Sequence, residues 1–108
     1  MTTPALPEGW EPADPDDARL LLEELQCELP PGHALFGVPL ETVAHRGGAS
    51  DDVLYRRRDD PQQFVVVHLT WLRRTEILPC PTIGFAGSFA AFLAHEKDNW
   101  GLTPPTTA

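Results

Sequence analysis

The stretch Phe-Val-Val-Val-His-Leu-Thr-Trp-Leu at residues 64–72 constrains the fold more than any other part of the chain. It is rich in β-branched and aromatic residues, which favour a strand, and the side chains of a strand alternate between its two faces. The two faces would be Val65, Val67, Leu69, Trp71 on one side and Phe64, Val66, His68, Thr70, Leu72 on the other. A strand with apolar residues on both faces is typical of the middle of a sheet that is covered twice. We therefore expect residues 64–72 to be a central strand.

Two further segments predict strands that pair with it. Residues 40–46 form a first strand, which the Gly-Gly-Ala-Ser turn at residues 47–50 ends, and residues 53–57 form a second. Asp-Asp-Pro-Gln at residues 59–62 is typical of a turn, since proline is well placed there. The expected sheet is a three-stranded antiparallel meander.

A helix on each side of these strands completes the expected α+β fold, in the order α-β-β-β-α. Asp14 can cap a helix over residues 15–29, and Pro15 suits its first position. Its apolar stripe is Ala18, Leu21, Leu22, Leu25, Leu29. A second helix over residues 89–98 would follow Ser88 and turn Phe89, Phe92 and Leu93 inward. We expect both sets of apolar residues to share one main core with residues 65–71.

The chain of 108 residues has the length of one domain. Residues 1–13 are expected to be a proline-rich acidic arm, which Trp10 pins to the body. Residues 14–101 would be a single α+β domain, and residues 102–108 a frayed tail.

The negative charge gathers at one end of the chain. Residues 1–28 contain eight acidic residues and Arg19 as their single base, a net charge of −7, whereas the whole chain carries −8. Such a charge repels nucleic acid and attracts a basic partner, although it could also serve solubility alone. On the outer face of the first helix it would form a partly apolar docking ridge of Asp16, Asp17, Leu20, Glu23, Glu24, Cys27.

A second candidate site lies on the mixed face of the sheet. If Tyr55 pairs with Val67, then Leu54 lies beside His68, and Asp52, Arg56 and His68 share that face. His68 could act as a general acid or base, Asp52 could orient it, and Arg56 could hold an anion. The alternative is that His68 is a buried histidine whose hydrogen bonds the protein itself satisfies.

The cysteines, the hydropathy and the N-terminal sequence exclude several classes of site and partner. Cys27 and Cys80 have no CxxC spacing, so we expect no metal site and no cofactor. We expect no disulfide between them either, because the sequence has no secretory segment and the cytosol is reducing. No apolar run is long enough for a membrane span and the acidic N-terminus does not resemble a signal peptide, so we expect a cytoplasmic protein that binds neither membrane nor nucleic acid.

Three short motifs resemble a family of small bacterial proteins to which no activity is assigned. They are Gly-His-Ala-Leu-Phe-Gly at residues 32–37, Asp-Asp-Val-Leu-Tyr at residues 51–55 and Val-Val-His-Leu-Thr-Trp at residues 66–71. The likeness runs over residues 20–95 and implies no activity for this chain. It adds the expectation that His33 and His68 act together.

Two functions follow as expectations. The first is a non-catalytic protein-binding domain, like an immunity protein or an adaptor, whose acidic first helix engages a basic partner. The alternative is a small enzyme or ligand-binding protein built around His68. A homodimer through Leu20 and Cys27, or through an uncovered sheet face, is compatible with both.

Overall fold

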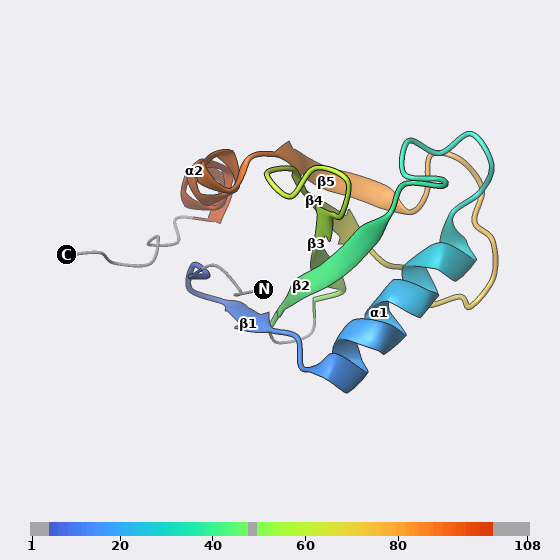
Figure 1. Ribbon diagram of the computed structural model, residues 1–108, viewed down its shortest axis with the longest axis horizontal. Helices are drawn as coiled ribbons and strands as arrows, with labels where there is room; N and C mark the ends of the chain where they lie inside the picture. The colour runs from blue at the N-terminus through green and yellow to red at the C-terminus, as the bar shows by residue number, and fades with distance from the viewer. Residues whose placement is uncertain (1–4, 48–49, 101–108) are drawn as a thin grey trace.

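In the computed structural model the chain forms one five-stranded antiparallel sheet with two helices (Figure 1). The structure describes residues 5–47 and 50–100. In sequence order the elements are β1 (Trp10–Pro12), α1 (Pro15–Glu28), β2 (Leu40–Arg46), β3 (Asp52–Arg57), β4 (Phe64–His68), β5 (Thr82–Gly87) and α2 (Phe89–Trp100). The strands lie in the order β1-β2-β3-β4-β5, so each pairs with its neighbour in sequence. Neither helix is long and apolar enough, among the described residues, to cross a membrane.

The prediction of a three-stranded meander is wrong, because both edge strands were missed. β1 is only three residues long, contains Pro12 and lies in the proline-rich arm of residues 1–13, where no strand was predicted. β5 has the sequence Thr-Ile-Gly-Phe-Ala-Gly, whose two glycines conceal the strand. The predicted third strand is also shorter than expected, because β4 ends at His68 rather than at Leu72. The expected tail, residues 102–108, lies outside the described residues.

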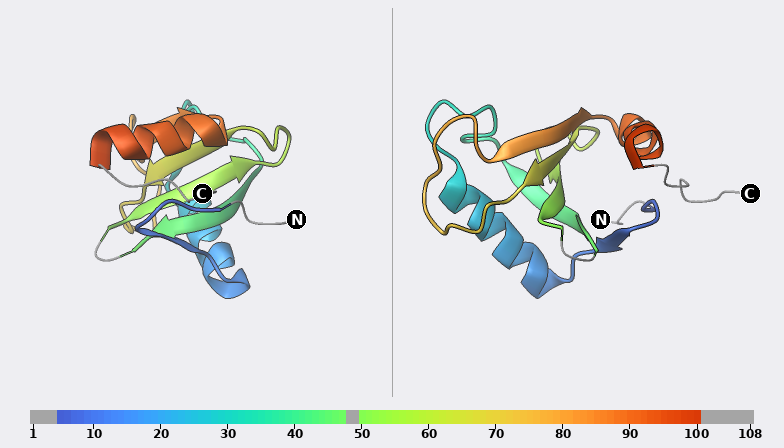
Figure 2. Two further views of the ribbon diagram at one scale, coloured as in Figure 1. Left: turned by 90° about the vertical axis from the view of Figure 1, so that its left-hand side faces the viewer. Right: turned by 180° about the vertical axis from the view of Figure 1, so that it is seen from behind.

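Each face of the sheet carries its own core, and each core is covered by one helix (Figure 2). This corrects the expectation of one shared core. The α1 side contains Leu25, Leu29, Leu35, Leu40, Val53, Tyr55, Val65, Val67, Leu69. The α2 side contains Trp10, Val43, Ala44, Leu54, Phe64, Val66, Phe92. β3 and β4 supply residues to both cores, as a central position requires.

The pairing of β3 with β4 is shifted by two residues from the predicted register. Tyr55 lies opposite Val65 rather than Val67, and Asp52 lies opposite His68. A shift of two residues keeps every side chain on its predicted face, because strand side chains alternate with a period of two. The register therefore brings Asp52 closer to His68 than the sequence suggested.

Capping and two side-chain hydrogen bonds fix α1 on the sheet. The Asp14 carboxylate accepts the backbone N–H of Asp17 at 2.8 Å, and Pro15 occupies the first turn. The Tyr55 hydroxyl donates to the carbonyl of Leu21 at 2.7 Å, and Thr42 donates to the carbonyl of Ala18 at 2.8 Å. These bonds set the first half of α1 beside β2 and β3, where a pocket forms.

A buried carboxylate ties α2 to the other face. Glu96 accepts a hydrogen bond from the Trp10 indole N–H at 2.7 Å and two from the Arg46 guanidinium at 2.9 and 3.1 Å. Arg46 also lies over the Trp10 ring, 4.5 Å from its centroid. Because Glu96 is fully buried, these donors replace the water that the charge has lost.

We expect Glu96→Ala to destabilise the protein by about 3 kcal/mol, since removing one partner of a buried pair leaves the other charge poorly compensated. Urea unfolding followed by circular dichroism measures this, and Glu23→Ala on the exposed face of α1 is the control, with a change below about 0.5 kcal/mol. Equal stability of the two variants would contradict this assignment.

Candidate functional site

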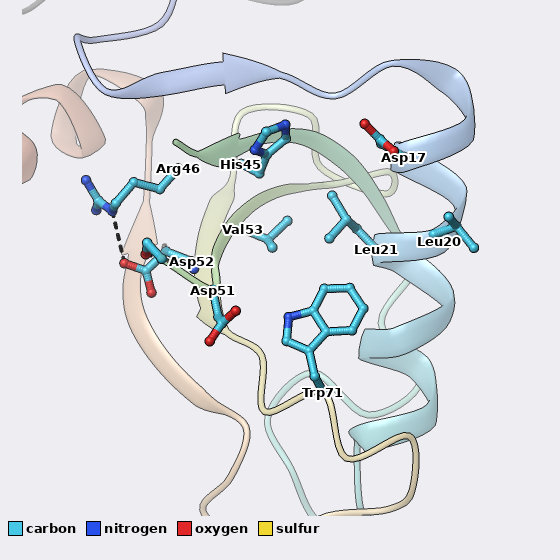
Figure 3. A pocket seen from close by; sticks show the side chains of 10 residues that line it. Asp17, Leu20, Leu21, His45, Arg46, Asp51, Asp52, Val53 and Trp71 are labelled. Atoms are coloured by element: carbon cyan, nitrogen blue, oxygen red, sulfur yellow. Dashed lines mark hydrogen bonds and ion pairs between the residues drawn. The ribbon is translucent and has the colours of Figure 1, made fainter. Parts of the chain in front are cut away.

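A pocket of about 260 Å³ opens between α1 and the turn end of β2 and β3 (Figure 3). We call it the α1–Trp71 pocket. Its lining residues are Asp17, Leu20, Leu21, His45, Arg46, Ser50, Asp51, Asp52, Val53, Trp71. In Figure 3 the Trp71 indole lies at the lower edge of this group, below Leu21 and to the right of Asp51, and Asp17 lies toward the start of α1. The pocket thus combines an aromatic ring and aliphatic walls with carboxylates.

Trp71 reaches this position because Glu28 holds the chain after β4. The Glu28 carboxylate accepts the backbone N–H of Thr70 at 3.0 Å and that of Trp71 at 2.9 Å. Trp71 has a φ of 60°, in the left-handed region that a bulky residue rarely adopts. Although β4 has ended, the side chain is brought next to α1 and remains 41% exposed. This corrects the expectation that Trp71 belongs to the core.

Glu24 continues the same attachment, one turn earlier on α1. Its carboxylate accepts the backbone N–H of Arg73 at 3.1 Å, and it is only 7% exposed. The structure therefore places Glu24 in the interior and not on the docking ridge. Burial raises the pKa of Glu28, and so does the neighbouring Glu24 carboxylate, to which the protonated Glu28 carboxyl can donate a hydrogen bond. The N–H groups of Thr70 and Trp71 oppose that rise.

The rest of the predicted docking ridge is on the surface. Asp16, Asp17, Leu20, Glu23 and Cys27 are all exposed. Arg19 lies 3.9 Å from Asp16 and 4.0 Å from Glu23. Pairs this long and this exposed neutralise little charge, so the outer face of α1 stays acidic.

Two carboxylates of the α1–Trp71 pocket make no hydrogen bond or ion pair through their side chains to other described residues: Asp17 and Asp51. The third, Asp52, accepts a hydrogen bond from Arg46 at 3.1 Å. Three aspartates and one arginine give the lining a formal charge of −2. Asp51 was not predicted as a site residue, although it is the first residue of the motif at residues 51–55.

His68 contacts Asp52, which lines the pocket, although His68 itself is not a lining residue. The His68 Nδ1 lies 3.0 Å from one Asp52 oxygen, and Arg46 holds the other oxygen. The His68 side chain is 55% exposed, so it is not a covered histidine. Arg56, the third predicted member, lies elsewhere: its guanidinium pairs with Glu41 of β2 and lies 5.7 Å from the centre of the Phe64 ring.

His33 has a structural role that separates it from His68. Its Nδ1 lies 3.0 Å from the backbone nitrogen of Leu35, and its Nε2 lies 2.7 Å from the carbonyl oxygen of Pro81. A backbone N–H can only donate and a carbonyl can only accept, so His33 is neutral and its proton is on Nε2. Both ring nitrogens are thus occupied.

Within the described parts of the chain, no three His, Cys, Asp or Glu side chains are grouped to hold a metal ion.

Comparison with known proteins gives no match to a protein-family model, a curated protein or a solved structure. The resemblance in residues 20–95 therefore stays a prediction, and the α1–Trp71 pocket and its surroundings are the basis for assigning a function.

The raised pKa of Glu28 predicts a pH-dependent stability. The folded state favours the protonated carboxyl, so its stabilising contribution is complete below the ordinary value of 4.5 and is lost as the pH rises through the folded pKa. Glutamine does not titrate, so the melting temperature of Glu28→Gln relative to the natural protein should increase across this range. Tyr55 stays neutral there, because burial and the two glutamates raise its pKa as well.

Melting curves between pH 4 and pH 8 measure this difference, and Glu23→Gln is the control for the same substitution at an exposed position of α1. A difference for Glu28→Gln that is constant or falls with pH would show that the carboxylate is not destabilised by its surroundings.

Proposed function

We propose that the protein is a non-catalytic binding domain that engages a basic protein partner through the acidic outer face of α1. The docking surface consists of Asp16, Asp17, Leu20, Glu23 and Cys27 together with the adjoining α1–Trp71 pocket. Glu24 is excluded because its carboxylate holds Arg73.

The distribution of exposed charge supports this proposal. Six of the eight acidic residues in residues 1–28 are exposed, and Glu24 and Glu28 are the two in the interior. An exposed field of one sign increases the rate of encounter with an oppositely charged protein and helps to select it.

The exposed apolar residues beside that charge are the main support for the proposal. Leu20 is 51% exposed and Trp71 is 41% exposed, and both line a pocket that also contains Asp17 and Asp51. Charge alone would serve solubility, whereas large apolar side chains at the surface cost free energy unless something covers them. Exposed tryptophan beside charged groups is typical of the residues that dominate binding energy at interfaces.

Selection of twelve-residue peptides from a random display library, with the whole protein as bait, tests the proposal. We expect the enriched peptides to be basic, to lose binding at about 1 M salt, where the Debye length is about 3 Å, and to lose it in the variant D16N/D17N/E23Q. The matched control E8Q/E11Q/D98N removes three exposed acids outside α1 and should retain binding.

Enrichment of neutral or acidic peptides would refute the proposal. So would binding that the α1 variant and its control weaken equally, because the effect would then come from net charge and not from this surface.

The His68–Asp52 contact favours one alternative function, a small-ligand or catalytic site. Asp52 orients the imidazole through Nδ1, and the exposed ring could exchange a proton with a bound molecule. We expect this function, if present, to appear as ester or phosphoester hydrolysis that His68→Gln reduces at least about 100-fold, within the range typical of general acid–base catalysis. Arg56→Gln should leave it unchanged, because Arg56 pairs with Glu41. Equal loss in both variants, or activity that survives in His68→Gln, would rule it out.

A further inference from the structure

We propose that the α1–Trp71 pocket binds an arginine side chain of the partner and so anchors the complex. The inference rests on the proposed function, which it deepens by naming the chemical group that enters the pocket.

The charge of the pocket selects a cation. Asp17 projects from α1 and Asp51 from the turn before β3, so the carboxylates approach from two different elements. Neither side chain bonds to another described residue, although each borders the same hollow. A cationic group that enters the hollow can bond to one of these carboxylates without displacing an existing bond, and the negative charge of the other also favours it.

The arginine of the protein that lines the pocket, Arg46, already pairs with two other carboxylates. Arg46 donates to Asp52 at 3.1 Å and to Glu96 at 2.9 and 3.1 Å, so its guanidinium is shared between two carboxylates. Its side chain is only 11% exposed, because it is held against the α2 side of the sheet. Arg46 therefore closes one end of the pocket without neutralising Asp17 or Asp51.

The walls favour arginine over lysine. The Trp71 indole lies beside Leu21 and Val53, so the interior is aromatic and aliphatic while the carboxylates lie toward its borders (Figure 3). A planar guanidinium can stack on an indole and bond to carboxylates at its edge at the same time. An ammonium group is a strongly hydrated point charge, which loses more hydration in such a pocket.

A titration with single amino-acid derivatives tests the pocket independently of any partner. The probes are N-acetylarginine amide, N-acetyllysine amide and N-acetylcitrulline amide, the last being nearly isosteric with arginine but uncharged. Two-dimensional ¹H–¹⁵N NMR follows the Trp71 indole N–H, assigned by its disappearance in Trp71→Leu. We expect the arginine derivative to shift this resonance with saturation in the millimolar range, the lysine derivative to bind more weakly, and the citrulline derivative to leave it unmoved.

Matched variants test which residues bind the arginine derivative. Asp17→Asn and Asp51→Asn should each raise the Kd of the arginine derivative about three- to five-fold, the range for a partly exposed ion pair. Asp16→Asn is the control, because Asp16 lies in the same first turn of α1 but does not line the pocket. Trp71→Leu should abolish saturable binding, judged from the backbone N–H of Asp51 and Val53, while Leu72→Ala on the neighbouring exposed residue should not.

Three results would overturn the inference: no saturable shift with the arginine derivative, equal binding of the citrulline or lysine derivative, or equal effects of Asp16→Asn and Asp17→Asn. A shift of the Trp71 indole N–H on changing protein concentration alone would instead assign the pocket to a second copy of the chain. If basic peptides from the library still bind through α1, the proposed function survives any of these failures.

Discussion

The carboxylate of Glu28 holds together the parts of the chain on which the candidate site depends. It lies at the end of α1, fully buried, and accepts the N–H groups of Thr70 and Trp71 just after β4 ends. These bonds satisfy backbone donors that have left the sheet, at the expense of burying an acid. As a result, Trp71 leaves the direction of the strand and lies beside the first half of α1. Without that attachment the residue would continue the face of β4, and the pocket would lack its aromatic wall.

A second constraint sets where the two candidate sites lie. β3 and β4 are apolar on both faces, so each face must be covered by a helix. Asp52, the first residue of β3, lies where the α1 side and the α2 side meet. It borders the α1–Trp71 pocket, yet it also contacts Arg46, which Glu96 holds from α2. The acidic pocket and the His68–Asp52 pair are therefore neighbours that share one carboxylate.

The sequence was informative where local pattern and tertiary packing agree. The bounds of β2 were predicted fully, α1 ends one residue before its predicted end, and β3 begins one residue earlier than predicted. Alternation placed Asp52 and His68 on one face even though the register was wrong by two residues. β1 and β5 were missed because proline and glycine are rare in strands, so their sequences do not predict one. In the structure, pairing with a neighbouring strand stabilises both. The position of Trp71 could not be predicted, since it depends on the Glu28 carboxylate, which lies 42 and 43 positions away from Thr70 and Trp71 in the chain.

The acidic residues of α1 show why charge in a sequence is not equivalent to charge on a surface. Glu23 and Glu24 are adjacent and were assigned to one ridge, yet one is exposed and the other is 7% exposed. Helical geometry turns Glu24 and Glu28, four residues apart, toward the same side, where the N–H groups of residues 70–73 replace water. Glu28 stands between Leu25 and Leu29 on the apolar stripe, which is the signal that could have identified it as buried. Because these two acids bind the loop, the negative charge that α1 exposes lies on Asp16, Asp17 and Glu23, and Asp17 is the one that borders the pocket.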